Sequence, residues 1–186
     1  MTSNDDRRLL LSVAREAIAA HVGERRSTAP ELTGVMTQRA GAFVTIHNRG
    51  ELRGCIGHVE ADEMLGRVIP RMAVAACSSD PRFPAVTDRE LPELDLEISI
   101  LGPLVPISSP DEIEVGRDGL VVQLGWHRGL LLPQVATEWK WDRETFLAHT
   151  CHKAGMPRDA WRNGAKVFRF EAEVFGERQP DRAEDF

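Results

Sequence analysis

The sequence predicts an α+β fold. Apolar residues at helical spacing alternate along the chain with segments whose polarity changes at every second residue, as in half-buried strands. Four of these strand segments form two pairs, each around a turn signal, which predicts two β-hairpins and therefore antiparallel pairing. A stretch rich in proline and serine, residues 103–110, lies between the two hairpins and is the best candidate for a linker between two parts of the chain.

The composition is ordinary for a globular protein and excludes some classes of function. The 186 residues suffice for one compact domain or two small ones, and a chain of this size buries about 70% of its unfolded surface. Hydrophobic residues make up 42% of the chain and charged residues 28%. The net charge of −6 argues against a nucleic-acid partner, because such binding needs clustered lysines and arginines.

The cysteines and the first residues predict where the protein resides. The three cysteines are odd in number and far apart, which favours a reducing compartment over a disulfide framework. The start of the chain is polar and the next apolar stretch is short and charged, so we expect neither a signal peptide nor a membrane span. We therefore expect a cytoplasmic protein. The chain itself implies no cofactor, since it has no set of cysteines for an iron–sulfur cluster and no nucleotide-binding glycine motif.

The first part of the chain is predicted to open with a helix and continue with a hairpin. The helix is expected from Asp6 to Val22, with N-cap oxygens just before it and a stop at Gly23. Residues 24–40 are expected to form a long loop. The strands Ala42–His47 and Leu52–Val59 follow, joined by a turn.

A second helix and a strand complete this part. The helix is expected to begin at Asp62 or Glu63, with a kink or a break at Pro70. Cys77 continues its apolar stripe and is expected to be buried. The strand Glu93–Leu101 alternates cleanly, so Leu94, Leu96, Ile98 and Ile100 face one way while Asp95, Glu97 and Ser99 face the other.

Beyond the linker, a second hairpin, a helix and a last strand are predicted. The hairpin strands are Gly119–Leu124 and Gly129–Leu132, with His127 in the turn between them. Asp142 is expected to cap a helix, and the last strand is Val167–Phe175. On that strand Phe168, Phe170, Ala172 and Val174 are predicted to share one face. Three tryptophans beside the helix are interpreted as core anchors: Trp139, Trp141 and Trp161.

The stretch Leu52-Arg53-Gly54-Cys55-Ile56-Gly57 is the main candidate for chemistry. On a regular strand Arg53 and Cys55 point to the same face, and a neighbouring guanidinium favours the thiolate. Gly54 and Gly57 allow a ligand or another backbone to come close. The alternative is a glycine-weakened strand with a packed cysteine and an arginine paired elsewhere, and the six residues alone favour this alternative. Strict alternation places His58 on the face opposite Cys55, which argues against a Cys55–His58 pair.

Further candidates come from other segments. Asp80-Pro81-Arg82-Phe83-Pro84 either presents an acid and a base beside an aromatic ring or is a rigid turn with an Asp80–Arg82 contact. Glu97 and Ser99 become site candidates if their face of the strand borders a cleft. His149 and His152 lie three residues apart on a helix, but no third ligand is near, so no metal site is predicted.

The same hexapeptide resembles the signature of the AMMECR domain family, whose prokaryotic members are called AmmeMemoRadiSam system protein A. The resemblance extends from Gly41 to Phe175. His58 departs from the family pattern, which has a small hydroxyl residue there, so no role is transferred to it. The other matching blocks are Gly41-Ala42-Phe43-Val44-Thr45, Asp80-Pro81-Arg82-Phe83-Pro84, Leu96-Glu97-Ile98-Ser99, Gly129-Leu130-Leu131-Leu132-Pro133-Gln134-Val135 and Cys151-His152-Lys153-Ala154-Gly155.

The resemblance implies an α+β fold of two subdomains, each an antiparallel sheet with flanking helices, the smaller inserted into the larger. The larger is expected to comprise residues 1–104 and 162–186 and the smaller residues 105–161. The hexapeptide is then expected where the subdomains meet. The family name implies an association with a Memo-like protein and a radical SAM protein, and it specifies no reaction. Iron and S-adenosylmethionine would belong to those partners.

Two hypotheses of function follow. In the first, the cleft around Cys55 handles a small, anionic substrate: Cys55 is the nucleophile, while Arg53, Gly54, Gly57, Asp80, Arg82, Glu97 and Ser99 bind substrate or move protons. In the second, the protein is a non-catalytic accessory subunit in which the hexapeptide is structural. Whether the protein is an enzyme stays open at this point. Direct nucleic-acid binding is disfavoured by the acidic charge balance.

Overall fold

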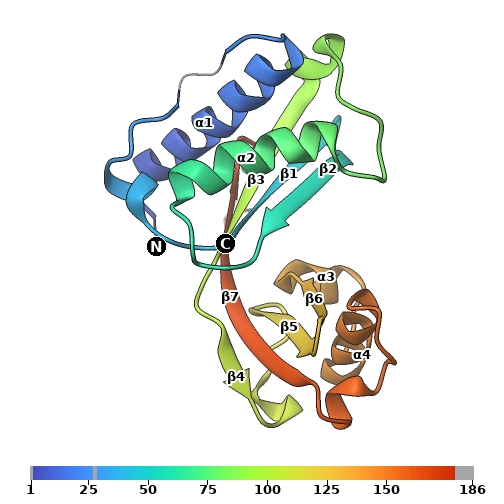
Figure 1. Cartoon of the computed structure of the whole chain (residues 1–186). Coiled ribbons are helices and arrows are strands. Elements are labelled where there is room, and N and C mark those ends of the chain that lie inside the picture. Colours follow the sequence, from blue (N-terminus) through green and yellow to red (C-terminus); the bar gives the residue numbers. More distant parts are fainter. Residues whose placement is uncertain (1, 27–28, 179–186) are drawn as a thin grey trace, which may run out of the picture. The chain divides into compact units, whose positions relative to one another are not determined.

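The computed structural model describes residues 2–26 and 29–178, and its contacts divide the chain into two compact units. The first unit comprises the residues up to Ile100 together with those from Glu173 on, and the second runs from Leu101 to Ala172 (Figure 1). Helices accompany antiparallel strands in both units, which confirms the α+β class. The domain boundaries predicted from the sequence stay a prediction.

The first unit is built on an antiparallel sheet. Its strands are β1 (Ala42–Asn48), β2 (Glu51–His58), β3 (Leu94–Leu101) and the last residues of β7 (Lys166–Gly176), in the order β2-β1-β3-β7. β1 and β2 form the predicted hairpin. β2 is the edge strand at one end of this order. The backbone groups on its outer side have no neighbouring strand to pair with, so other parts of the chain or water must satisfy them.

Two helices, α1 (Asn4–Val22) and α2 (Leu65–Ser78), pack on one face of this sheet (Figure 1). A capping box at Ser3 starts α1 and Gly23 ends it, as the sequence predicts. Of the two outcomes expected at Pro70, the break is wrong, because α2 is a single helix that contains this proline, and the kink stays a prediction. Burial of its apolar stripe against the sheet outweighs the one missing backbone hydrogen bond.

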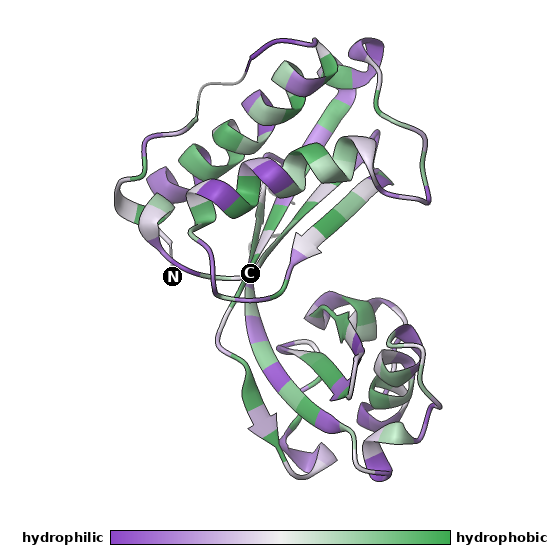
Figure 2. Ribbon diagram, in the orientation of Figure 1, coloured by the Kyte–Doolittle hydropathy of each residue, from purple (hydrophilic) through white to green (hydrophobic). Residues whose placement is uncertain are grey.

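The core of the first unit lies between these helices and the sheet. Alternate residues of β1 and β3, such as Val44 and Leu96, are fully buried against the helices. Apolar bands, green between purple polar ones, run along both helices in Figure 2. A short 3-10 helix, η1 (Gly34–Thr37), adds Val35 and Met36 to this core, so the segment predicted as a loop is partly ordered.

The second unit has its own sheet and core. The sheet consists of β4 (Val105–Ile107), β5 (Asp118–Leu124), β6 (His127–Leu131) and β7 up to Ala172, in the order β4-β7-β5-β6. The helices α3 (Pro133–Glu138) and α4 (Arg143–Lys153) accompany it. Phe146, Leu147 and Cys151 of α4 are buried in this core. The remaining short 3-10 helices are η2 (Asp88–Glu93), η3 (Pro110–Glu112) and η4 (Ala160–Arg162).

Several expectations for the second unit are corrected. Part of the predicted linker forms β4, which pairs with β7. His127 begins β6 and does not lie at the hairpin tip, where Trp126 is fully exposed. Trp139 is 66% exposed and is therefore not a core anchor, whereas Trp141 and Trp161 pack against the core. Among the helices of residues 2–26 and 29–178, none has the length and apolar character needed to span a bilayer.

Candidate functional site

Cys55 lies on the face of the first unit's sheet that points away from the helices. It is paired across the strands with Thr45, whose neighbours Val44 and Ile46 point into the helix-covered core. The hydroxyl of Thr45 donates a hydrogen bond to the Cys55 sulfur at 3.3 Å. Cys55 is partly accessible, whereas Cys77 and Cys151 are buried. Cys55 is thus the thiol that a small molecule reaches most easily.

The turn after α2 covers the backbone of β2 at Cys55. A carboxylate oxygen of Asp80 accepts the Cys55 N–H at 2.9 Å, and the Arg82 guanidinium donates to the Cys55 carbonyl at 3.4 Å. Asp80 and Arg82 also form an ion pair at 2.7 Å, the contact expected for a rigid turn, one of the two alternatives for this segment. The turn therefore supplies hydrogen-bond partners for both backbone groups of Cys55 on the edge strand β2, and it holds a cation beside this residue.

Asp80 and Arg82 hold each other in the charged form. Asp80 is only 4% exposed, yet its hydrogen bonds from Arg82 keep the pKa of its carboxyl well below the usual value, against the opposing effect of burial. The hydrogen bond with Asp80 raises the pKa of Arg82, and the nearby Cys55 adds to this effect. The Arg82 side chain is 53% exposed, so its charge is available to a ligand.

The Arg53 side chain points to the loop between α2 and η2. Its guanidinium donates to Glu90 at 2.7 Å and to the backbone carbonyls of Pro84 and Ala85 at 2.8 and 3.3 Å. The pairing register shifts between Ile46 and His47, so Arg53 has no direct partner on β1. The strict alternation assumed for the hexapeptide is therefore wrong at Arg53. With 14% of its side chain exposed, Arg53 mainly ties this loop to β2.

Gly54 and Gly57 allow close packing on opposite faces of β2. A Cβ atom on Gly54 would lie 2.1 Å from the Ala76 carbonyl oxygen of α2. A Cβ atom on Gly57 would lie 2.3 Å from the ring of Phe43 on β1. Both glycines are thus required by contacts within the first unit, whatever they do toward a ligand.

Glu97 and Ser99 lie on the same face as Cys55, in two cross-strand rows. Thr45 stands between Cys55 and Glu97, its direct partners on the two neighbouring strands. Phe43 stands in the same way between Gly57 and Ser99. Cys55 and Glu97 are thus two strand spacings apart, roughly 10 Å. The Ser99 hydroxyl is buried and has no hydrogen-bond partner among the described residues.

Thr45 is the site residue that the motif-based interpretation missed. It lies on a predicted strand of the hairpin, but a regular register continued from the turn would pair it with Gly54, and the register shift near Arg53 is what places it opposite Cys55. The sequence did not show that this hydroxyl would donate to sulfur, because the hairpin register depends on the irregularity near Arg53.

The other two cysteines differ from Cys55 in both access and acidity. Burial raises the pKa of the Cys77 thiol to about 11, and Cys77 donates to the Val74 carbonyl within α2. Burial also raises the pKa of the Cys151 thiol. Both are core residues, which confirms the burial predicted for Cys77 from the apolar stripe of its helix.

The ion pair between Arg53 and Glu90 predicts an acid sensitivity. The Arg53 hydrogen bond lowers the pKa of Glu90 from 4.5 to about 2. A depressed carboxyl pKa stabilises the fold above the unfolded value, and this contribution is lost as the pH falls from 4.5 toward 2. We expect Glu90→Gln to be less stable than the wild type near neutral pH and to lose less stability on acidification. Urea unfolding between pH 7 and about pH 3 measures this.

The control for this prediction is Glu51→Gln, at the exposed start of β2. It should leave the pH dependence of the unfolding free energy unchanged. Equal acid sensitivity in the Glu90→Gln variant and the wild type would contradict the assignment of Glu90 as Arg53's stabilising partner.

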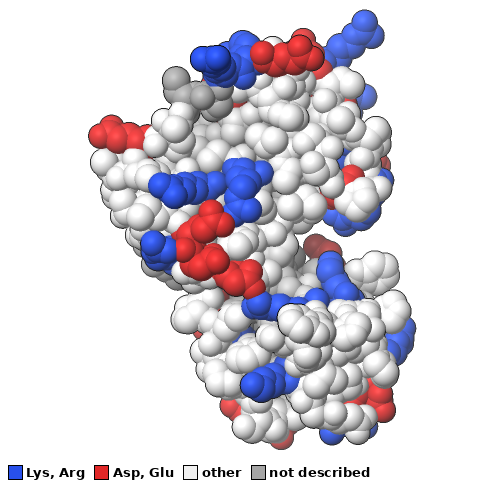
Figure 3. All heavy atoms as spheres, in the orientation of Figure 1, with Lys and Arg blue, Asp and Glu red and all other residues white. Residues whose placement is uncertain are grey.

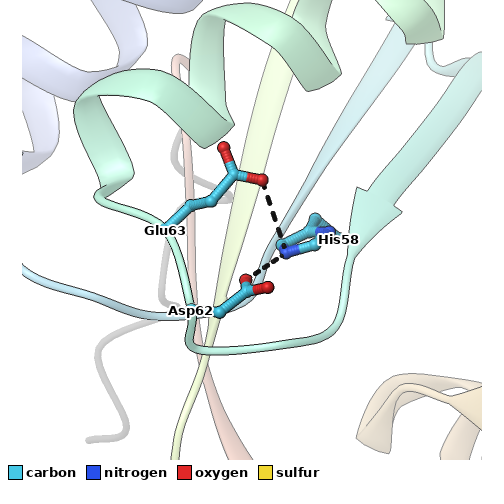
Figure 4. Close-up of side chains that lie close together, drawn as sticks. All are labelled: His58, Asp62 and Glu63. Carbon is cyan, nitrogen blue, oxygen red and sulfur yellow. Dashed lines mark hydrogen bonds and ion pairs between the residues drawn. The ribbon is translucent and has the colours of Figure 1, made fainter.

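A second group of polar side chains lies at the other end of β2. His58, Asp62 and Glu63 each offer one potential metal-ligand atom, and these atoms lie within 4.8 Å of one another (Figure 4). No metal site was expected at His149 and His152, and the His149 ring stacks on Trp141, with ring centroids 4.0 Å apart. On the face drawn in Figure 3, several acidic side chains form one red group with blue basic side chains beside it.

Comparison with known proteins identifies the family. The AMMECR1 family matches residues 11–175. A protein of Methanothermobacter thermautotrophicus is 46% identical over 184 residues, covering 94% of this chain and 96% of the relative. A protein of Methanocaldococcus jannaschii is 42% identical over 176 residues, covering 90% and 88% of the two chains.

A solved structure agrees in fold. The crystal structure of an uncharacterized protein from Pyrococcus horikoshii has a TM-score of 0.86 and 39% sequence identity, and the match covers 92% of this chain and 91% of that one. The family match spans most of the chain and the two relatives are similar over nearly their whole lengths. This chain belongs to the AMMECR1 family.

Proposed function

We propose that the protein handles a small anionic molecule at Cys55, with the thiol acting on the substrate and Arg82 attracting its negative charge. One observation carries this proposal. A partly accessible thiol accepts a hydrogen bond from Thr45, and a half-exposed guanidinium is fixed beside the same residue. A hydroxyl donor and a neighbouring cation both favour the thiolate, which is the nucleophilic form of cysteine.

The surrounding residues take different parts in this proposal. Asp80 positions the Arg82 side chain and the backbone of Cys55. Arg53 donates to the loop after α2 and so positions the segment that carries Asp80 and Arg82. Glu97 and Ser99 are proposed as polar contacts for the substrate on the same face of the sheet, because the pairing with β1 aligns them with Thr45 and Phe43. The buried Ser99 hydroxyl supports this part, since unpaired buried donors are costly unless a partner is supplied.

We further propose that the protein acts with a Memo-like protein and a radical SAM protein, as the family resemblance implies. Any iron or S-adenosylmethionine would then be bound by those partners. The free cysteines fit the cytoplasm as the place of this activity.

A non-catalytic accessory role is the second candidate, and a specific observation favours it. Arg53, Gly54 and Asp80 all have demonstrable structural contacts: an ion pair to the loop, a helix carbonyl at packing distance, and the covered edge of β2. On this view the hexapeptide holds β2, α2 and the loop together, and a partner binds elsewhere.

The variant Cys55→Ser distinguishes the two candidates. If chemistry at the thiol is the function, this variant keeps its stability and its binding to the Memo-like protein, while pathway activity in a strain lacking the native gene is lost. A loss of stability with partner binding and pathway activity intact supports the accessory role instead. Cys77→Ser serves as the control for loss of a buried thiol.

The role of Arg82 is tested by comparing a charged and a neutral alkylating reagent. We expect Cys55 to react faster with the anion iodoacetate, relative to neutral iodoacetamide, than a free thiol in solution does, because Arg82 attracts the anion. In Arg82→Gln this relative preference for iodoacetate should fall several-fold, and high salt should reduce it in the wild type. Mass spectrometry of the alkylated peptide measures both rates.

The matched control is Arg8→Gln on α1, which removes a charge from the helical layer of the same unit. Because the iodoacetamide rate is measured in each variant, a general change in the access to Cys55 cancels in the ratio. An unchanged ratio in Arg82→Gln would remove Arg82 from the proposed anion site.

A further inference from the structure

We infer that His58, Asp62 and Glu63 form a binding site for a divalent first-row transition-metal ion such as Zn²⁺. Figure 4 shows the three side chains converging: His58 from the end of β2, and Asp62 and Glu63 from the segment that leads into α2. The imidazole Nε2 lies 2.6 Å from an Asp62 carboxylate oxygen and 3.8 Å from a Glu63 carboxylate oxygen. This cluster lies at the opposite end of β2 from Arg53 and is independent of the function proposed for Cys55.

The distances fit a metal centre. Two ligand atoms bound to tetrahedral zinc at 2.0–2.2 Å are about 3.4 Å apart, a value between the two distances from Nε2. Small side-chain rotations therefore suffice to seat an ion in place of the direct contact between His58 and Asp62. Three protein ligands leave at least one coordination position open for water or an exogenous ligand.

The backbone of the segment is already fixed, which lowers the entropic cost of binding. Arg39 donates to the Asp62 carbonyl and forms a β-bridge with Met64. The Leu65 N–H donates to the Gln38 carbonyl at 2.8 Å. The His58 side chain is 21% exposed, so the ring is held among neighbouring groups with Nε2 directed at the two carboxylates. Preorganisation of this kind is what a specific metal site requires.

The ligand chemistry selects the class of ion. One imidazole and two carboxylates suit Zn²⁺, Mn²⁺, Fe²⁺ or Co²⁺, whereas Mg²⁺ and Ca²⁺ prefer oxygen ligands alone. A Glu60 carboxylate oxygen lies 4.0 Å from Nδ1 of His58, so this acidic side chain is close to the ring nitrogen that would not bind the ion. Arg71 donates to the same Glu63 oxygen that faces Nε2, at 2.5 Å, so an ion that binds here displaces this guanidinium or takes the other oxygen of Glu63.

The test is calorimetric titration of the untagged full chain with ZnCl₂ after removal of metals by a chelator. We expect saturable binding of one Zn²⁺ per chain at micromolar concentration. His58→Gln and Asp62→Asn should each weaken binding by about 100-fold or more, since losing an outer-shell partner alone typically costs 10–100-fold. His152→Gln on α4 is the matched control and should bind as the wild type does.

Two further measurements keep the result unambiguous. Co²⁺ bound to the wild type should show no thiolate-to-metal charge-transfer band, which excludes Cys55 as the ligand. Asp62→Asn changes an exposed side chain and is expected to keep the circular dichroism spectrum of the wild type, so lost binding is not lost folding. Absence of saturable binding by the wild type, or full binding by both variants, overturns the inference.

Discussion

Replacing Gly54 with alanine is expected to lower the free energy of unfolding by about 3 kcal/mol or more, at the upper end of the cost of overpacking. The reason is the contact between β2 and α2. The added Cβ atom would lie 2.1 Å from the Ala76 carbonyl oxygen and 3.1 Å from its carbon. Both are backbone atoms of a helix packed in the core, so relief requires that the strand and helix separate. Urea unfolding of the variant measures the loss.

Gly57→Ala is the matched control, three residues along the same strand. Its Cβ atom would meet the Phe43 side chain, which can shift more easily than backbone, so we expect a smaller cost of about 1–3 kcal/mol. A loss of less than about 1 kcal/mol in Gly54→Ala would show that β2 and α2 are not in close backbone contact.

Within the hexapeptide, residues needed for packing can be distinguished from the residue that can react. Packing against α2 is enough to explain why residue 54 is a glycine, without any ligand. The hydrogen bonds of Arg53 to the loop explain the arginine in the same way. Cys55 and the half-exposed Arg82 are the members of this neighbourhood that a solute can meet. A motif of six residues therefore combines packing requirements with a candidate reactive group.

Most of the first unit could be predicted from periodicity alone. The capping residues of α1, the β1–β2 hairpin and β3 follow from local patterns that agree with the tertiary packing. The failures occur where packing overrides a local rule. Pro70 predicts a kink or a break in α2, and the break does not occur because the buried stripe on both sides of Pro70 keeps the helix continuous.

The last strand shows a limit of period-two analysis. Alternation predicts one buried face containing Phe168, Phe170, Ala172 and Val174, yet Phe170 and Phe175 are buried while Val174 is 42% exposed. The strand passes from the second unit into the first, and each unit has its own core. A single alternating pattern cannot describe a strand whose buried side is set by two different cores.

The candidate site could be predicted only in part. The contact of Asp80 with Arg82 follows from two prolines that restrict the turn, and the shared face of Glu97 and Ser99 follows from alternation. The direction of the Arg53 side chain could not be predicted, because it depends on a register shift and on the distant Glu90. The convergence of His58 with Asp62 and Glu63 likewise depends on how the short connection between β2 and α2 turns back.

The proposal for Cys55 predicts a large difference in reactivity among the three cysteines of the native protein. Cys77 and Cys151 are at most 2% exposed, and burial raises the pKa of both thiols. At pH 8 a thiol with a pKa of about 11 is roughly 0.1% thiolate, compared with tens of per cent for an unperturbed thiol. We therefore expect Cys55 to be alkylated at least about 100-fold faster than Cys77.

The most direct measurement of the central claim is the rate of iodoacetamide labelling at each cysteine of the folded protein, followed across pH by mass spectrometry. The proposal predicts that Cys55 alone is labelled in the native state and that all three cysteines are labelled after unfolding in urea. It also predicts that native Cys55 labels faster near neutral pH than a free cysteine peptide does, because the thiolate is favoured. Labelling of Cys55 only after unfolding would contradict the claim that this thiol acts on a substrate.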